Sequence, residues 1–213
     1  MTSTPTPALV SRSLTDFAAA LAARTATPGG GSMAAFLAAS GVALVAMAAR
    51  FTSGEKFASI EAPMAAAAGA LDQLRPRALG LVDRDAASYD AVTAAFALPK
   101  SNDTEKAARG VAIQSAMKGA LEVPFETMQL ALAGLELAAP LAAQVNSNLA
   151  SDCGVGARCL HTALEGAFLN VRINAGSIKD AEYTAARLRE SQGMRARAQE
   201  LSTQIAGTIE SRL

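Results

Sequence analysis

Apolar residues recur along the chain in long runs of helical character, and the alternating runs of β-branched and polar residues that mark strands are missing. Ala, Leu, Met, Glu, Arg and Lys, which favour helix, dominate nearly every long segment. No shift in composition marks a domain boundary, and no repeat of roughly 20 to 50 residues is present. We therefore predict an all-α fold in which residues 13–213 form a single-domain helical bundle.

Caps and helix-breaking residues predict where the helices begin and end. Ser13 opens a capping box and starts a first helix that reaches about residue 24. Asn102 is a candidate cap of a later helix, as are Ser151 or Asp152, and Pro124 is expected to end one. The remaining helices are expected over residues 31–51, 57–97, 103–121, 125–137, 151–174, 179–190 and 195–213.

The segment from Gly31 to Ala49 carries no charge over nineteen residues, which is about the thickness of a bilayer. It consists mostly of Ala, Gly, Ser and Met, which gain far less from lipid than Leu, Ile or Phe. Ala35, Ala39 and Ala43 form a small-residue pattern that lets a second helix approach closely. We interpret the segment as the long central helix of a bundle or a dimer core, and we expect no membrane contact.

The charge and composition argue against a nucleic-acid partner. The formal net charge is zero, aromatic residues make up 4% of the chain and Trp is absent, so neither a basic nor a base-stacking surface is expected. Cys153 and Cys159 suit neither a local disulfide nor a CxxC site, and free thiols are typical of a reducing compartment. Residues 1–12 lack the regions of a signal peptide and are predicted to form a flexible tail.

Three consecutive glycines, Gly29 to Gly31, follow Pro28 and precede Ser32 at the start of the uncharged segment. The segment lacks the GK[ST] of a P-loop and follows a helix rather than a strand, so neither nucleotide-binding fingerprint applies. Two interpretations remain open. The glycines form either a tight turn that lets helices pack closely, or a bare backbone wall at a helix N-terminus whose free amides meet a flat or anionic ligand.

Two charged residues beside apolar segments are candidates for chemistry. Lys56 follows the uncharged segment and is either the solvated end of a helix or a cation that balances a carboxylate or donates a proton. Asp85 shares a helical face with Tyr89, and a carboxylate on an apolar face is unfavourable unless it has a partner or a role.

The segment from residue 145 to 174 is the richest in polar candidates. Asn170 and Asn174 are four residues apart, so both amides project from one helical face and suit hydrogen bonding to a heterocycle. Asp152 stands at the start of the helix, where the dipole favours its charge and where it can also be an N-cap. His161 has no other metal ligand at a suitable spacing, so no metal site is expected.

The order of these motifs resembles that of one enzyme family. The chain carries in succession TPGGGS, TSGEKF, LVDRDAASYDAV, LPKSNDTEKAAR and NSNLASD, followed by GVGA and LNVRIN. Over residues 14–189 it is similar to the cyclodeaminase/cyclohydrolase family, which comprises methenyltetrahydrofolate cyclohydrolases and the cyclodeaminase domain of formiminotransferase-cyclodeaminase. The resemblance implies a cytoplasmic, all-helical homodimer that binds a tetrahydrofolate derivative near the dimer interface and uses no metal or redox cofactor.

The resemblance also implies roles for the polar clusters. The flat pterin would lie against the backbone of the glycine segment and bind the amides and hydroxyls, namely Gly29, Gly30, Gly31, Ser32, Asn146, Asn148, Ser151, Asn170 and Asn174. Asp85 would act as base or cation partner, Lys56 as proton donor or shuttle, and Asp152 would orient the pterin or serve as a second carboxylate. Which aspartate is the base stays open.

The expected reaction is hydrolysis of 5,10-methenyltetrahydrofolate to 10-formyltetrahydrofolate. The alternative within the family is cyclodeamination of 5-formiminotetrahydrofolate with loss of ammonia, which needs the same site; a single-domain chain favours the hydrolase. A third alternative is a non-catalytic helical module that binds a ligand or another protein. That module predicts that Asp85 and Lys56 do not face a common cleft, whereas the enzyme predicts that they do.

Overall fold

A computed structural model describes residues 8–213, and all regular elements in this range are helices, which confirms the all-α prediction. Short 3-10 helices occur at Leu9–Ser11 (η1), Glu55–Phe57 (η2) and Ser147–Leu149 (η3). The α-helices are α1 (Leu14–Ala22), α2 (Gly30–Arg50), α3 (Glu61–Ala97), α4 (Asp103–Ala142), α5 (Ala150–Ala175) and α6 (Ala181–Glu210).

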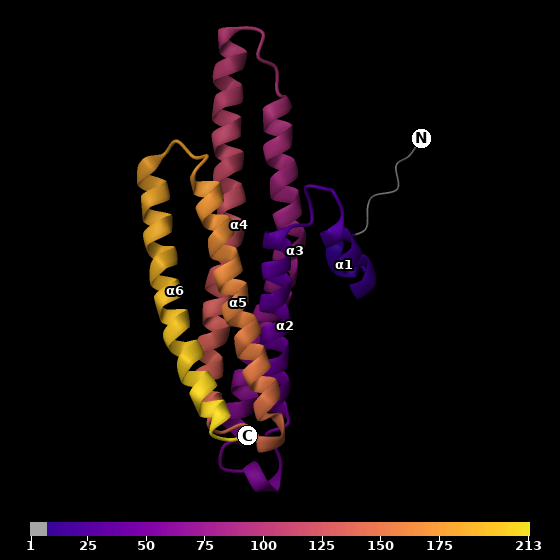
Figure 1. Ribbon diagram of the computed structural model, residues 1–213, viewed down its shortest axis with the longest axis vertical. Coiled ribbons are helices and arrows are strands. Elements are labelled where there is room, and N and C mark those ends of the chain that lie inside the picture. The colour runs from indigo at the N-terminus through magenta and orange to yellow at the C-terminus, as the bar shows by residue number, and fades with distance from the viewer. Residues whose placement is uncertain (1–7) are drawn as a thin grey trace.

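Helices α2 to α6 run along one common axis, and α1 stands to the side of the bundle (Figure 1). Helix α2 packs most extensively against α3 and α5, so it is the central helix that the sequence predicts. Small residues allow this packing: a Cβ at Gly41 would come within 2.8 Å of the Gly156 carbonyl oxygen on α5. By length and composition α2 could cross a membrane, but 61% of its apolar window is buried inside the bundle.

Three predicted helix boundaries are wrong because packing overrides local breakers. Helix α4 continues through Pro124, α6 is unbroken through Gly193, and α5 begins at Ala150 without a side-chain cap from Ser151 or Asp152. At Pro124 the neighbouring residues are buried in the core, and their burial outweighs the roughly 3 kcal/mol that a proline costs inside a helix. The caps at Ser13 and Asn102 are confirmed, since both side chains accept a hydrogen bond from a backbone amide of the first helical turn.

Residues 1–12 were predicted to form a flexible tail, but residues 9–11 form the short helix η1. Residues 1–7 lie outside the described residues. Within the remainder, Leu9 is buried, and its amide donates to Asp83 Oδ1 on α3 at 2.5 Å. Residues 9–11 therefore belong to the packed structure, because an apolar side chain and a satisfied amide hold them on α3.

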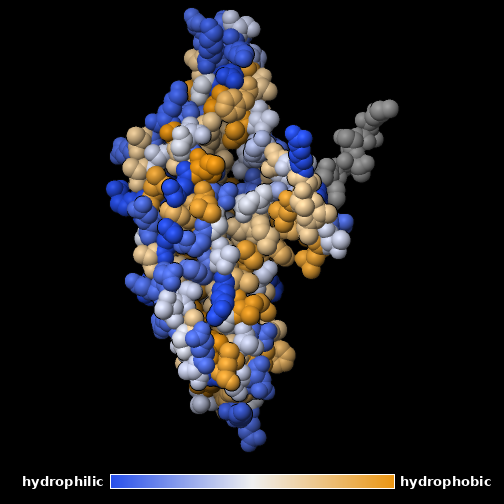
Figure 2. Space-filling model, viewed as in Figure 1, coloured by the Kyte–Doolittle hydropathy of each residue, from blue (hydrophilic) through white to orange (hydrophobic). Residues whose placement is uncertain are grey.

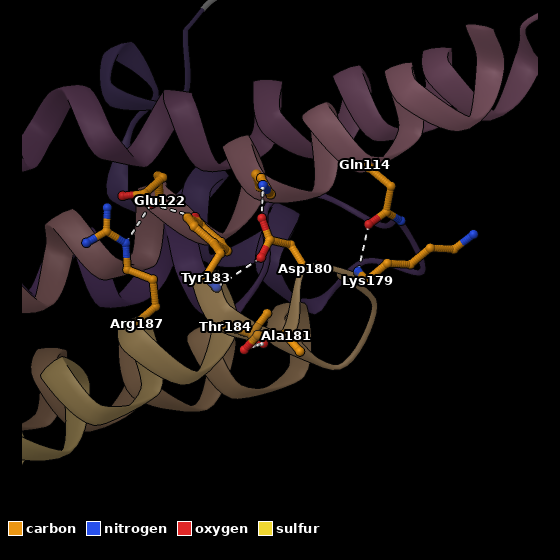
Figure 3. Close-up of polar contacts among 9 residues, drawn as sticks. Gln114, Glu122, Lys179, Asp180, Ala181, Tyr183, Thr184 and Arg187 are labelled. Carbon is orange, nitrogen blue, oxygen red and sulfur yellow. Dashed lines mark hydrogen bonds and ion pairs between the residues drawn. The ribbon is translucent and has the colours of Figure 1, made fainter. Parts of the chain in front are cut away.

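A polar cluster fixes α6 and the loop before it against α4 (Figure 3). The Tyr183 hydroxyl donates to Glu122 Oε1 at 2.5 Å, and Arg187 Nε donates to the same oxygen at 2.8 Å. Burial and the Glu122 carboxylate raise the pKa of Tyr183 to about 12, so the phenol stays neutral. Gln114 accepts from the Lys179 amide at 2.7 Å. The cluster thereby sets the position of residues 176–180, the loop between α5 and α6.

Candidate active site

A cleft of about 320 Å³ opens at the N-terminal end of α2, which is within the size range of small-molecule sites. Its walls come from the loop before α2, from α3, α4 and the C-terminal part of α5, and from the loop after α5. The lining residues are Ala26, Thr27, Gly29, Gly30, Gly31, Asp85, Ser88, Tyr89, Val92, Met117, Ala120, Asn170, Asn174 and Ser177. Residues that are distant in the sequence thus meet at one end of the bundle.

Asp85 lies against the first turn of α2. Its Oδ2 accepts a hydrogen bond from the Ser32 hydroxyl at 2.8 Å. A Cβ on Gly31 would lie 2.1 Å from Oδ1, so a side chain at this position would force the carboxylate to move. The N-cap residue of α2, Gly29, supplies no side-chain acceptor, and Asp85 brings a negative charge from α3 to this helix N-terminus.

The surroundings of Asp85 make it more basic than an ordinary aspartate. Burial raises the pKa of the carboxyl above its usual range, and the hydrogen bonds from the Ser32 hydroxyl and backbone amide partly oppose this effect. Tyr89 is the other titratable side chain that lines the described cleft. A carboxylate of raised pKa, facing a cavity, suits proton abstraction near neutral pH.

Asn170 and Asn174 line this cleft from α5. Their Nδ2 atoms donate to the backbone oxygens of Gly166 and Ala120, each at 2.9 Å. Within residues 8–213 neither Oδ1 accepts a hydrogen bond, so both remain available to N–H donors of a ligand. The predicted amide pair is therefore held by the backbone on one side and offers acceptors on the other.

Five predicted site residues lie elsewhere in the chain, at the opposite end of the bundle. Lys56 is in η2, after the C-terminus of α2, and the others lie in or beside η3 and at the start of α5, namely Asn146, Asn148, Ser151 and Asp152. The 21 residues of α2 separate the two ends by about 30 Å. Asp85 and Lys56 therefore do not face a common cleft in this chain, which contradicts the expectation for the enzyme and is the arrangement that the non-catalytic alternative predicts.

At that opposite end Asn146 has its hydrogen-bond partners within the chain. The Asn146 amide donates to Thr52 Oγ1 at 2.8 Å, its Nδ2 donates to the Phe51 oxygen at 3.3 Å, and its Oδ1 accepts from the Asn148 amide at 3.1 Å. Asn146 thus ties the loop before α5 to the end of α2. Lys56 is exposed, and its ammonium lies 5.4 Å from the centre of the Phe57 ring.

Several cleft residues have no strong signal in the sequence. Met117 and Ala120 come from α4, and their apolar side chains give no sign of a binding role. Tyr89 could be found through its spacing from Asp85, and its side chain is 48% exposed. Ser32 was predicted to bind substrate, but it is fully buried behind Asp85 and does not line the cleft.

No group of three or more His, Cys, Asp or Glu side chains among residues 8–213 is placed to hold a metal ion. Cys153 is buried and Cys159 half-buried, and both thiols are free, as the sequence predicts. Burial raises the pKa of Cys153 to about 11, so this thiol is not a nucleophile at neutral pH.

Comparison with known proteins identifies similar chains over almost the whole length. The sequence profile of formiminotransferase-cyclodeaminase matches residues 13–193. A methenyltetrahydrofolate cyclohydrolase of Methylorubrum extorquens is 37% identical over 91% of this chain and 93% of its own length. The formimidoyltransferase-cyclodeaminase of Gallus gallus is 35% identical over 82% of this chain, which spans 32% of that longer protein.

A solved structure shows the same arrangement of helices. The crystal structure of formiminotetrahydrofolate cyclodeaminase from Thermotoga maritima superposes with a TM-score of 0.84 at 27% sequence identity. The match covers 94% of this chain and 97% of that one.

Proposed function

The chain belongs to the formiminotransferase-cyclodeaminase family, and we propose that it hydrolyses 5,10-methenyltetrahydrofolate to 10-formyltetrahydrofolate. The relative named as a methenyltetrahydrofolate cyclohydrolase supports this choice, since the two chains match over 93% of its length. The observation that carries the proposal is the half-buried carboxylate of Asp85 in a cleft that also holds amide acceptors.

The substrate is a cationic amidinium, so its methenyl carbon is already electrophilic. Asp85 stabilises the cation and accepts a proton from the water that adds to this carbon. The tetrahedral adduct then collapses, the bond from carbon to N5 breaks, and N5 takes up a proton while the formyl group stays on N10. The Oδ1 atoms of Asn170 and Asn174 accept hydrogen bonds from the pterin, which fixes the reacting carbon beside the carboxylate.

Purified protein offered 5,10-methenyltetrahydrofolate tests the proposal directly. We expect the methenyl absorbance to fall faster than the spontaneous rate. No acceleration over that rate contradicts the hydrolase.

Cyclodeamination is the second candidate, because the superposable solved structure carries that name. In this reaction 5-formiminotetrahydrofolate closes to the methenyl form and releases ammonia. The same cleft and carboxylate serve both reactions, so the substrate decides. A gain of methenyl absorbance from the formimino compound, with no loss from the methenyl compound, replaces the first assignment with the second.

We propose that the active form is a homodimer formed through one apolar face, the α2/α5 face. This face consists of half-buried Met33, Leu37, Leu44 and Met47 on α2 and exposed Val155, Leu169 and Ile173 on α5. Figure 2 shows apolar groups along the middle of the bundle in this view. The face is about 30 Å long and two helices wide, which approaches the roughly 800 Å² per partner of a stable interface.

A two-fold axis across the middle of the α2/α5 face gives a role to the distant polar end. Such an axis places the Lys56 end of one chain beside the Asp85 cleft of the other, since it exchanges the two ends of α2. We propose that Lys56 then protonates the departing N5, and that Asp152, with the neighbouring Asn146, Asn148 and Ser151, borders the pterin from the second chain.

Mixed dimers test this arrangement. Alone, Asp85→Asn and Lys56→Met are each expected to retain about a tenth of the wild-type activity or less. In a randomly mixed dimer population, roughly a quarter of all sites combine an intact Asp85 with an intact Lys56, so activity recovers to about that level. Absence of recovery in proven mixed dimers contradicts the shared site, and a monomeric wild-type protein at micromolar concentration in light scattering contradicts the dimer.

We further propose that the enzyme works in the cytoplasm, without metal or redox cofactor, and contacts neither nucleic acid nor membrane. The absence of a net charge and the burial of most of α2 support the last two points. Full turnover after exhaustive treatment with a metal chelator is the expected result, and a loss that added metal restores contradicts it.

A further inference from the structure

In the first turn of α2, the Ser32 side chain faces Asp85 and not the cavity. Its side chain has 0% exposure, although Gly30 and Gly31 beside it line the cleft. A fully buried hydroxyl cannot reach a ligand. Its hydrogen bond goes instead to Asp85 Oδ2, at 2.8 Å and across 53 residues of sequence.

Building on the proposed function, we infer that Ser32 is a positioning residue that holds Oδ2 of Asp85 so that Oδ1 is directed at the substrate. Among residues 8–213 no donor side chain occupies Oδ1, and Asp85 lines the cleft. A hydrogen bond to one oxygen fixes the rotation of the carboxylate before the substrate reacts. The entropy cost of orienting this group is then not part of the reaction barrier. The Ser32 hydroxyl also favours the ionised form, since it donates to the charge.

Gly31 completes this arrangement from the other side. Its missing Cβ leaves the space that Oδ1 fills, because a Cβ there would sit 2.1 Å from that oxygen. At Gly30 a Cβ would be 3.6 Å from Asn170 Nδ2, which is an ordinary contact. The two adjacent glycines therefore differ: Gly31 makes room for the carboxylate, and Gly30 does not.

The electrostatic surroundings of Asp85 make the role of Ser32 measurable. The elements packed around the cleft bring no charged side chain to the carboxyl, and the described titratable neighbour is Tyr89 on the same helix. Burial raises the pKa of Asp85 and the Ser32 hydrogen bonds lower it. Removal of the hydroxyl therefore moves the pKa further upward.

The decisive test combines kinetics with a titration that needs no activity. In Ser32→Ala we expect about a tenfold or larger loss of kcat, an unchanged KM, and an acid limb of the pH–rate profile displaced to higher pH. In ¹³C NMR the Asp85 carboxyl should titrate at higher pH in Ser32→Ala than in the wild type. Ser32→Thr retains the hydroxyl and should restore both readouts, and Ser40→Ala is the matched control because its hydroxyl donates to Phe36 O of the same helix.

An Asp85 titration unchanged by Ser32→Ala overturns the inference, as does a rise in KM with unchanged kcat. If Ser32→Ala does not fold, two glycine variants decide: we expect Gly31→Ala to lose about a hundredfold in kcat, and Gly80→Ala on α3, where an added Cβ would meet nothing within 4 Å, to stay within about threefold. Equal losses in both variants overturn the inference. A wild-type protein inactive on both folates contradicts the proposed function alone, because the NMR titration still reports on Ser32.

Discussion

The two ends of α2 carry similar polar residues but use them in different ways. At the N-terminal end, Asn170 and Asn174 each donate one side-chain N–H to a backbone oxygen, and their Oδ1 atoms stay available to a ligand in the cleft. At the C-terminal end, the backbone amide, Nδ2 and Oδ1 of Asn146 all form hydrogen bonds within the chain. Residue type and spacing thus show that a polar group needs a partner, and the packing decides whether that partner is backbone or ligand.

The same contrast holds for charge. Among residues 8–213 Asp85 has no ion-pair partner and is half-buried in a cleft, whereas Lys56 is exposed to solvent. A charge that is withdrawn from water without an opposite charge beside it is a strong indicator of function. An exposed lysine indicates a function in the same way only if a second chain covers it.

The largest expected effect follows from removal of the Asp85 charge. We expect Asp85→Asn to lower kcat/KM by about 10²–10⁴-fold, because the amide cannot accept the proton of water. Loss of methenyl absorbance under pseudo-first-order conditions measures the effect. Asp83→Asn, two residues away with its carboxylate on the Leu9 amide, is the matched control and should stay close to wild type. Comparable losses in both variants would place the chemistry elsewhere.

A smaller effect is expected at the opposite end. Lys56→Met should lower kcat by about 10- to 100-fold, since a dimer partner would lose the donor for N5. Lys100→Met removes another exposed ammonium, in the loop between α3 and α4, and should leave kcat unchanged. Full activity of Lys56→Met would make the C-terminal end of α2 purely structural and confine the site to one chain.

Much of the fold and one half of the site could be predicted from the sequence. The helix caps at Ser13 and Asn102 are local signals, and so is the shared face of Asn170 and Asn174. The positions of the two ends could not be predicted, because motif order says nothing about the roughly 30 Å that a 21-residue helix places between its flanking loops. The continuity of α4 through Pro124 was equally hidden, since it depends on burial by other helices.

The hydrogen bonds between Thr52 and Asn146 at the C-terminal end of α2 should contribute to stability and not to catalysis. Thr52 is fully buried, and its hydroxyl accepts from the Asn146 amide while donating to the Ala48 oxygen, both at 2.8 Å. Thr52→Ala leaves that amide without its acceptor, and we expect a loss of about 1–3 kcal/mol in the free energy of unfolding. Urea titration measures it. Thr203→Ala removes a similar hydroxyl on exposed α6 and should change stability by less than about 0.5 kcal/mol.

The smallest effect concerns stability at the cleft, and it has a defined pH dependence. The pKa of Asp85 is raised in the folded state above its ordinary value of 3.8, so the native protein binds that proton more tightly than the unfolded chain. The contribution of Asp85 to stability is thus fully present below the ordinary pKa and is lost as pH rises through the folded one.

Asp85→Asn stays neutral at every pH and removes this loss. Its free energy of unfolding relative to wild type should increase from about pH 4 upward and level off once wild-type Asp85 is ionised. Urea titrations of both proteins from acid to neutral pH measure the difference. A difference that is constant over this range would mean that the carboxylate is solvated in the folded protein, and the contrast between the two ends of α2 would then lose its electrostatic basis.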